Sequence, residues 1–329
     1  MDLKSGAGAP RSRDGRFRNN HRNSAHGGKS LLAFLREWRK AGWTRPGFPK
    51  AHNDPAWLAA NRSQTSITWI GHASFLVQLG GINLLTDPVL SRRTSPVQWA
   101  GPARIAPLGL SLAELPKIDV VLISHNHYDH LDEATVRQLA GRDAPAFVVP
   151  LGLKAWLARR GIEQAIELDW WQHAEVRGLR VHAVPAQHFS GRGAGDRNRT
   201  LWCGYVYECG GRRHYFAGDT GYGPDFVEIG RRFAPIDLAM IPIGAYDPRD
   251  FMRPVHVDPE EAVRIHGDVG SRQSLAMHWG TFRLTLESLD EPPRRLAAAL
   301  AAAGIPAAAF RVLQHGETLL DPGEQTAAR

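Results

Sequence analysis

Cysteine is scarce in this sequence: among 329 residues, only Cys203 and Cys209 are cysteines. Two cysteines exclude a disulfide framework and a Cys-rich zinc module, so we expect both to be small buried side chains in a reducing compartment. The sequence also lacks a run of about 18 apolar residues, which excludes a membrane-spanning helix, and its N-terminus lacks the apolar segment of a signal peptide. These absences predict a cytoplasmic protein, peripheral at most on a membrane surface.

Net charge is nearly absent from most of the chain. The whole sequence carries +7, but residues 1–50 hold 12 Lys and Arg against 3 Asp and Glu, a net charge of +9, and the remainder holds 28 against 30, a net charge of −2. A nearly neutral body argues against a nucleic-acid partner. The basicity belongs to a leading arm, which could meet an anionic surface.

The leading arm divides into two parts. Residues 1–29 are rich in Gly, Arg, Asn and Ser with almost no apolar content, which is typical of a disordered segment. Residues 30–40 place four large apolar side chains on one helical face behind a Ser N-cap, which predicts an amphipathic helix. This helix could lie on an anionic membrane or dock on the protein itself, and the pattern favours neither arrangement.

Metal-capable side chains are concentrated directly after an apolar run, residues 118–123, that predicts a buried strand. Four of them fall within six positions: His125, His127, Asp129 and His130. Imidazole and carboxylate suit Zn²⁺, Mn²⁺ or Fe. In an extended turn His125 and His127 point the same way, while Asp129 and His130 belong to the next bend, so one strand end can supply two metals. A solvated His-rich turn is the alternative, but it requires neither the spacing nor the strand.

Other polar residues also follow predicted strands. From about residue 66 the chain alternates strands and helices without a repeat or linker, so we predict a basic, largely disordered arm over residues 1–49 and one α/β domain over residues 50–329. Sites in α/β proteins form outside the carboxyl ends of strands, so polar side chains there can converge. Those side chains are Asp87, His188, Asp219 and His278. Asp87 could accept a hydrogen bond from a metal-bound His, or only form a turn before Pro88.

The spacing of these residues resembles a known family. The pattern His125-x-His127-x-Asp129-His130, with the later single residues His188, Asp219 and His278 and with Asp87 before it, is similar to the five-motif signature of the metallo-β-lactamase superfamily. Longer strings resemble the branch of N-acylphosphatidylethanolamine-hydrolysing phospholipase D, namely residues 69–73, 85–88, 123–132, 216–222, 241–246, 256–265 and 278–282. The resemblance covers roughly residues 50–318, and neither the basic arm nor the loop at residues 191–199 takes part in it.

The resemblance implies a fold and a set of roles. The fold would be an αβ/βα four-layer sandwich of two mixed β-sheets flanked by helices. Two Zn²⁺ ions per chain would be held by two groups of ligands joined through a bridging carboxylate. These are His125, His127 and His188 for one ion, Asp129, His130 and His278 for the other, and Asp219 for the bridge. Asp87 would orient a ligand through a hydrogen bond, and Tyr128 and His256 would contact the substrate.

The resemblance also implies an activity. The chain would be a zinc-dependent phosphoric diester hydrolase of phospholipase D type, converting N-acylated ethanolamine phospholipids to N-acylethanolamine and phosphatidic acid. Two cations about 3.5–4 Å apart would lower the pKa of a shared water, and the bridging hydroxide would attack phosphorus in line. Catalytic roles fall to Asp129 and to His256, which could donate a proton to the departing oxygen.

Two other functions are compatible with the same residues. A hydrolase of a soluble phosphodiester or a lactone would use an identical metal site. A non-catalytic metal-binding module is disfavoured, because structural zinc sites close with four ligands. The expected partners are a phospholipid substrate and an anionic membrane surface. The sequence does not decide between a monomer and a homo-oligomer. Other imidazoles of the chain are expected to be structural or on the surface, namely His72, His173, His182, His214, His266 and His315.

Overall fold

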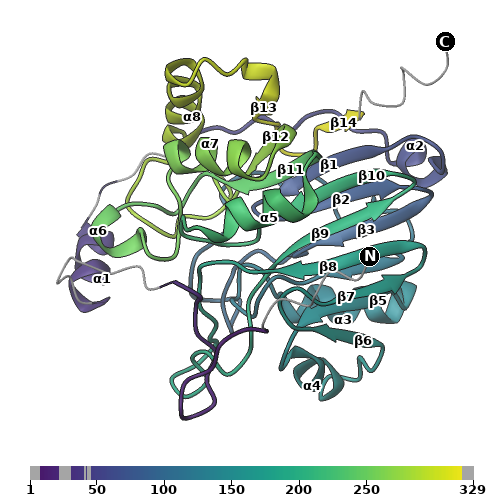
Figure 1. Ribbon diagram of the computed structural model, residues 1–329, viewed down its shortest axis with the longest axis horizontal. Helices are drawn as coiled ribbons and strands as arrows, with labels where there is room; N and C mark the ends of the chain where they lie inside the picture. The colour runs from purple at the N-terminus through teal and green to yellow at the C-terminus, as the bar shows by residue number, and fades with distance from the viewer. Residues whose placement is uncertain (1–7, 22–30, 41, 43–45, 321–329) are drawn as a thin grey trace.

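Two seven-stranded β-sheets lie face to face in the computed structural model, which describes residues 8–21, 31–40, 42 and 46–320 (Figure 1). In order across the first sheet, the strands are β14 (Thr318–Leu320), β1 (Ser66–Gly71), β2 (Ser74–Leu79), β3 (Ile82–Thr86), β4 (Val120–Leu122), β5 (Ala146–Pro150) and β6 (Ala165–Leu168). Across the second sheet they are β13 (Phe310–Arg311), β12 (Ser271–Met277), β11 (Ile236–Pro242), β10 (Arg212–Phe216), β9 (Gly204–Cys209), β8 (Leu179–Val184) and β7 (His173–Val176).

Both sheets are mixed, as predicted. Strands β1, β2 and β3 are antiparallel neighbours, and β3 to β6 are parallel. Likewise β7 to β10 are antiparallel, and β10 to β13 are parallel. Gly80 and Gly81 join β2 to β3 with φ of +59° and +78°, the left-handed backbone that a tight two-residue hairpin turn requires. The parallel halves bring several strand ends to one edge, where the polar residues follow.

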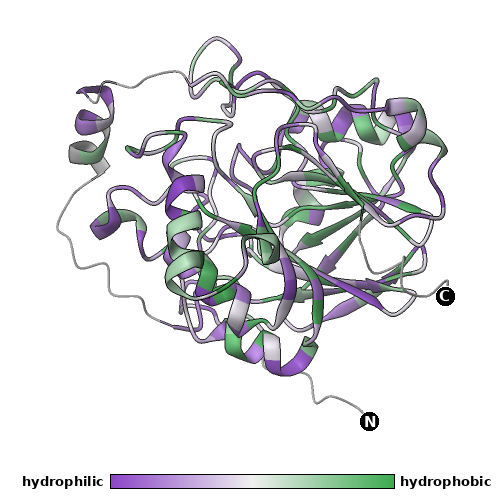
Figure 2. Cartoon of the chain, turned by 90° about the horizontal axis from the view of Figure 1, so that it is seen from above, coloured by the Kyte–Doolittle hydropathy of each residue, from purple (hydrophilic) through white to green (hydrophobic). Residues whose placement is uncertain are grey.

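The helices of the described residues lie outside the two sheets, although not all of them pack on a sheet face (Figure 1). They are α1 (Leu31–Lys40), α2 (Pro55–Ala60), α3 (Glu133–Asp143), α4 (Leu153–Ala158), α5 (Asp225–Phe233), α6 (Arg249–Met252), α7 (Pro259–Asp268), α8 (Glu291–Ala302) and the short 3₁₀ helix η1 (Ala307–Ala309). One buried apolar cluster joins the sheets and continues to α5, α7 and α8, and a second lies between the first sheet and α2, α3 and α4. Figure 2 shows hydrophobic residues along the central strands and on the helices packed against them. The predicted αβ/βα sandwich is therefore confirmed.

The two strands on either side of His315 and Gly316 do not pair with each other as a hairpin. Strand β13 pairs with β12 in the second sheet, whereas β14 pairs with β1 in the first. The intervening turn is held across the sheets, since the Gly316 N–H donates to the carbonyl of Trp69 at 2.7 Å. Each of the two strands thus pairs with the edge strand of an existing sheet. This pairing forms more backbone hydrogen bonds than two short strands could form with each other alone.

The leading arm is also more ordered than predicted. Residues 8–21 pack on the domain, and Phe17 is only 2% exposed, with its N–H bonded to the carbonyl of Asn198 at 2.9 Å. The expectation of disorder is wrong for this stretch, because one buried aromatic ring and a series of backbone hydrogen bonds replace the missing apolar content. The rest of residues 1–29 lies outside the described residues.

Helix α1 meets the domain through its aromatic side chains. The ring of Phe34 is buried and stacks on Phe251 with ring centroids 5.4 Å apart. The Arg283 guanidinium lies over the Trp38 ring, 4.8 Å from its centroid, and donates to the Trp38 carbonyl at 3.1 Å. Of the two arrangements that the sequence left open, these contacts support docking on the protein.

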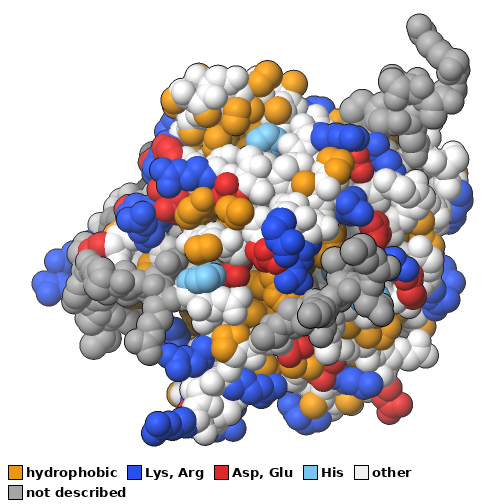
Figure 3. Space-filling view, in the orientation of Figure 1, with side chains coloured by type: hydrophobic (Ala, Val, Ile, Leu, Met, Phe, Trp, Pro, Cys, Tyr) orange, Lys and Arg blue, Asp and Glu red, His pale blue; other side chains and the backbone are white. Residues whose placement is uncertain are grey.

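The surface is mixed in charge. Figure 3 shows basic and acidic side chains interspersed on the face seen there, without a continuous basic stripe. Among the residues that the structure describes, no helix has both the length and the apolar character that crossing a bilayer requires.

Candidate metal centre

The His-rich turn (residues 124–130) follows strand β4, and it lies beside the end of the parallel neighbouring strand β3. Asp87 follows β3 with φ of +32°, and its N–H donates to the carbonyl of Leu122 at 2.9 Å. Its carboxylate accepts from the backbone N–H of Ser124 at 2.6 Å, from the Ser124 hydroxyl at 2.5 Å and from Nδ1 of His130 at 2.6 Å. The predicted hydrogen bond from an imidazole of the turn to the Asp87 carboxylate is therefore present, and it leaves Nε2 of His130 free to face the cluster.

Three imidazoles form the first group. Nδ1 of His127 lies 2.8 Å from Nε2 of His125 and 3.2 Å from Nε2 of His188, which follows β8. The other nitrogen of His188 donates to the carbonyl of Val255 at 2.9 Å, which fixes its tautomer. Burial lowers the pKa of His127 to about 3 and that of His188 to about 4, and it holds the pKa of His125 well below its ordinary value. All three rings are thus neutral at pH 7, the form that binds metal.

A second group of side chains is arranged around two carboxylates. Nε2 of His130 lies 3.0 Å from Oδ2 of Asp219, and Nε2 of His278 lies 3.1 Å from Oδ1 of Asp219. Both nitrogens are 3.6 Å from Oδ2 of Asp129. Burial opposes protonation of His278, but the Asp219 and Asp129 carboxylates outweigh it and raise the pKa of His278 to about 9. A cation bound here would take the place of that proton.

Asp219 connects the two groups. Its Oδ2 lies 3.9 Å from Nε2 of His125 and 3.8 Å from Nε2 of His188, so one carboxylate faces imidazoles of both groups. It stands in the turn after β10, where Gly218 has φ of +62° and a side chain would come within 2.9 Å of the Ser124 Cβ. Glycine therefore allows Asp219 to approach the His-rich turn.

The donor set fits metal ions. His130 Nε2, His278 Nε2 and Asp219 Oδ1 are buried and have no hydrogen-bond partner among the described residues. His278 Nε2 nevertheless lies 3.1 Å from Asp219 Oδ1, and His130 Nε2 lies 3.0 Å from Asp219 Oδ2. Buried polar atoms without partners are costly, and a cation that accepts their lone pairs removes the cost. All seven predicted ligands belong to groups whose donor atoms lie within 4.8 Å of one another. The chain therefore holds a His/Asp cluster able to bind metal.

The two predicted substrate contacts differ in position. His256 borders the cluster, with its ring centroid 5.1 Å from that of His188 and 5.3 Å from that of His278, and its buried Nδ1 has no partner among the described residues. Burial holds the pKa of His256 well below its ordinary value. Tyr128 instead turns away from the cluster, because its hydroxyl donates to the carbonyl of Arg192 at 3.2 Å.

His72 belongs to the centre, although the sequence analysis assigned it a structural or surface role. Its Nε2 donates to Oδ2 of Asp129 at 3.0 Å, and its ring centroid is 4.0 Å from that of His278. It is 2% exposed, and burial, with the nearby His278, lowers its pKa to about 3. The signal that could have revealed it is its place after β1, in the string of residues 69–73 that resembles the phospholipase D branch.

We expect His72→Asn to lower metal affinity about tenfold, because the shorter side chain cannot hold the Asp129 carboxylate in place. Asparagine tolerates the positive φ of +55° at this position, so the backbone stays unstrained. Affinity is measured by competition with a chelator. His266→Asn, which removes a buried imidazole bonded to Ser274, is the control and should leave affinity unchanged.

The N-terminal stretch also contributes to the centre. The Asn19 side chain donates to the carbonyl of His188 at 2.9 Å and accepts from the His188 N–H at 3.1 Å. It also accepts from the Trp202 indole at 2.9 Å. A residue far away in sequence thus fixes both backbone groups of a candidate ligand, which makes Asn19 a positioning residue.

Asn19→Ala is expected to destabilise the fold by about 1–3 kcal/mol and to reduce turnover about tenfold, since the backbone of His188 loses both partners. Chemical denaturation and steady-state kinetics measure the two effects. Asn20→Ala is a matched control, because the Asn20 side chain donates to Asp225 at 2.9 Å and, among the described residues, makes no hydrogen bond to His188. Equal behaviour of the two variants would show that Asn19 does not position the ligand.

Comparison with known proteins identifies the family. Residues 82–279, more than half of the chain, match the beta-lactamase superfamily domain. The chain belongs to this superfamily. An uncharacterized protein of Mycobacterium tuberculosis is 45% identical over 261 residues, covering 78% of this chain and 69% of the relative. The N-acyl-phosphatidylethanolamine-hydrolyzing phospholipase D 1 of Caenorhabditis elegans is 40% identical over 257 residues, covering 74% of this chain and 72% of the relative.

Solved structures of hydrolases share the fold. A metallo hydrolase of Ignicoccus hospitalis aligns with a TM-score of 0.59 at 24% identity, covering 78% of this chain and 98% of that one. An isothiocyanate hydrolase from Delia radicum gut bacteria aligns with a TM-score of 0.60 at 24% identity, covering 77% and 98%. Together with the relatives named as metal-dependent hydrolases, the fold and cluster confirm that this superfamily member is a metal-dependent hydrolase.

Proposed function

We propose that the protein is a binuclear zinc phosphodiesterase that cleaves N-acylated ethanolamine phospholipids to N-acylethanolamine and phosphatidic acid. The observation that carries the proposal is the position of Asp219, whose two oxygens face the imidazoles of both groups at 3.0–3.9 Å. One carboxylate between two sets of donors is suited to a pair of divalent cations rather than to one. The substrate assignment is supported by relatives of that name at 40% and 38% identity.

The ligands would divide as the sequence suggests. His125, His127 and His188 would hold one zinc, Asp129, His130 and His278 the other, and Asp219 both. Metal ions held there supply Lewis acidity toward a phosphoryl oxygen and ionise water at neutral pH. Asp87 and His72 keep the ligands oriented, because each makes a hydrogen bond of 2.6 or 3.0 Å to one of them.

His256 is the group of the chain placed to assist the leaving oxygen. It is neutral, buried and adjacent to His188 and His278, and its Nδ1 has no other partner among the described residues. An N–H held there can donate a hydrogen bond to the oxygen that departs from phosphorus. Tyr128 would contact the substrate outside the cluster, at the wall that it shares with Arg192.

The test is a parallel assay of the purified enzyme against N-acylphosphatidylethanolamine, a cyclic nucleotide and a lactone, with elemental analysis of the metal. We expect turnover of the lipid and about two zinc ions per chain. Turnover of only the soluble substrates would assign the same centre to a different hydrolase, and one metal per chain would reject the binuclear site.

A further inference from the structure

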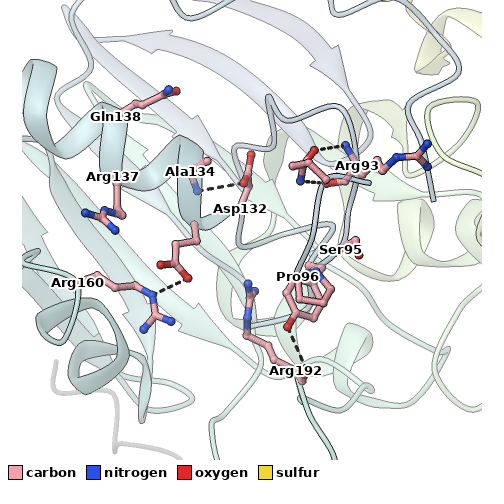
Figure 4. A pocket seen from close by; sticks show the side chains of 12 residues that line it. Arg93, Ser95, Pro96, Asp132, Ala134, Arg137, Gln138, Arg160 and Arg192 are labelled. Carbon is pink, nitrogen blue, oxygen red and sulfur yellow. Dashed lines mark hydrogen bonds and ion pairs between the residues drawn. The ribbon is translucent and has the colours of Figure 1, made fainter. Parts of the chain in front are cut away.

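A cavity of about 610 Å³ (Figure 4) has Tyr128 of the His-rich turn in its lining but none of the candidate metal ligands. It is enclosed by the first turns of α3, the end of α4, the loop at residues 191–199 and the loop at residues 91–101. Tyr128, which stands between the candidate ligands His127 and Asp129, forms part of its wall. A ligand in this cavity would therefore lie beside the substrate.

The cavity has a surplus of positive charge. The lining includes Arg137, Arg160 and Arg192, which Figure 4 labels, and Glu133, whose carboxylate pairs with Arg160 at 2.9 Å. The second acid of the lining, Asp132, is engaged by the N–H groups of Ala134 and Ser91 at 3.2 and 3.0 Å and by the Thr135 hydroxyl. The lining therefore holds four arginines, Arg93 among them, against two carboxylates that both already have partners.

Two of these guanidinium groups are held in fixed planes. Arg192 stacks over the Tyr128 ring at 3.9 Å and donates from one nitrogen to the carbonyls of Asn126 and Leu131 at 2.9 and 2.7 Å. Arg160 stacks over the Trp156 ring at 3.5 Å. Stacking occupies the flat faces of a guanidinium and leaves its N–H edge for an oxyanion.

Arg137 completes the group from helix α3. It is exposed, and within the described part of the chain it has neither an ion-pair nor a hydrogen-bond partner. A phosphate matches this arrangement, because its several oxygens can bridge donors from different elements.

The rim of the cavity carries an apolar anchor. Trp99, directly after the lining residue Gln98, is 82% exposed. Its loop is nonetheless closed, because the Arg93 N–H donates to Gln98 Oε1 at 3.1 Å and the Gln98 amide donates back to the Arg93 carbonyl at 3.0 Å. A rigid loop that presents an indole to solvent is suited to the headgroup level of a bilayer.

We propose that the cavity binds the headgroup phosphate of an anionic phospholipid, with Trp99 entering the membrane interface beside it. The arrangement would place the opening near Tyr128 against the bilayer from which a lipid substrate comes. The inference rests on the proposed function for its view of the substrate as a bilayer lipid. According to this proposal, the main contact with the membrane is made by the loop at residues 91–101 and not by helix α1, which is docked on the protein.

The experiment compares sedimentation of the metal-loaded protein with vesicles of phosphatidylcholine, with and without phosphatidylglycerol. Arg137→Gln should weaken binding to the anionic vesicles about fivefold, as expected for one cation at a charged surface. Trp99→Ala should weaken binding to both kinds of vesicle by a factor on the order of ten, since it removes the buried indole area. Both residues are exposed, so the fold should persist, which circular dichroism checks.

Arg294→Gln is the matched control, because it removes the same charge from an exposed arginine on α8, away from α3 and α4 (Figure 1). It should bind vesicles like the wild-type protein. Equal vesicle binding by the Arg137→Gln, Trp99→Ala and Arg294→Gln variants would overturn the proposal. Arg137-dependent binding of inorganic phosphate without vesicle binding would also overturn it, in favour of a soluble phosphorylated ligand.

Turnover of detergent-dispersed N-acylphosphatidylethanolamine, measured alongside, separates this inference from the proposed function. A protein that binds anionic vesicles through Arg137 and Trp99 but does not hydrolyse the lipid upholds the site and rejects the activity. If the protein hydrolyses the dispersed lipid while both variants bind vesicles normally, the activity is upheld and the proposed binding site is rejected.

Discussion

Asp219→Asn is expected to lower turnover by a factor on the order of a thousand and to reduce the metal content of the chain. The carboxylate faces His130 and His278 at 3.0 and 3.1 Å and reaches toward the other group of imidazoles. An amide carries no charge, and one of its two terminal atoms is an N–H₂ group that cannot ligate a cation. Elemental analysis and steady-state kinetics on the same preparation measure both effects.

Asp143→Asn provides the matched control for this substitution. Asp143 is a largely buried carboxylate at the end of α3, where it accepts from the N–H of Ile118 at 3.0 Å and pairs with Arg142. The variant should keep its metal and its activity, with only a loss of stability. Full metal content and turnover in Asp219→Asn would contradict the bridging role, and would return the non-catalytic module to consideration.

The sequence predicted the cluster because the information was local. Four ligands lie in the His-rich turn itself, and the others each follow a strand. Sites in α/β proteins form outside the carboxyl ends of strands, so these residues were expected to converge. The α/β character of the domain and the candidate residues at strand ends could therefore be predicted from the residues alone, whereas the two-sheet sandwich and the division of the ligands between two metals came from the family resemblance.

The supporting contacts could not be derived, because they depend on distant segments. Asn19 reaches His188 across a separation of 169 residues, and nothing in a Gly- and Arg-rich arm marks one asparagine as buried against the domain. His72 was expected to be a structural or surface residue, because its hydrogen bond to Asp129 exists only when the end of β1 and the His-rich turn are side by side. A pattern of residue types predicts elements and strand ends, but not which loop will close over them.

Asp87→Asn is expected to reduce metal affinity and turnover about 10- to 100-fold. The Asp87 carboxylate is fully buried and accepts from His130 Nδ1 at 2.6 Å, which directs Nε2 of His130 at the cluster. Burial raises the pKa of Asp87, while the hydrogen bonds from His130 and Ser124 lower it. A neutral amide can still accept one bond, but it no longer increases the basicity of the imidazole. Chelator competition measures affinity without reference to turnover.

Two companion variants isolate the bond to His130. Ser124→Ala removes the hydroxyl that also bonds Asp87 but leaves the imidazole contact, so it should have a smaller effect than Asp87→Asn. Asp119→Asn changes a carboxylate next to β4 that accepts from the Asn83 backbone N–H at 2.9 Å and touches no candidate ligand within the described part of the chain, so it should keep wild-type affinity. Because asparagine accommodates the φ of +32° at position 87, a loss there reflects the missing charge and not backbone strain. If Ser124→Ala alone reproduces the loss, Asp87 acts by holding the turn together and not by orienting the imidazole.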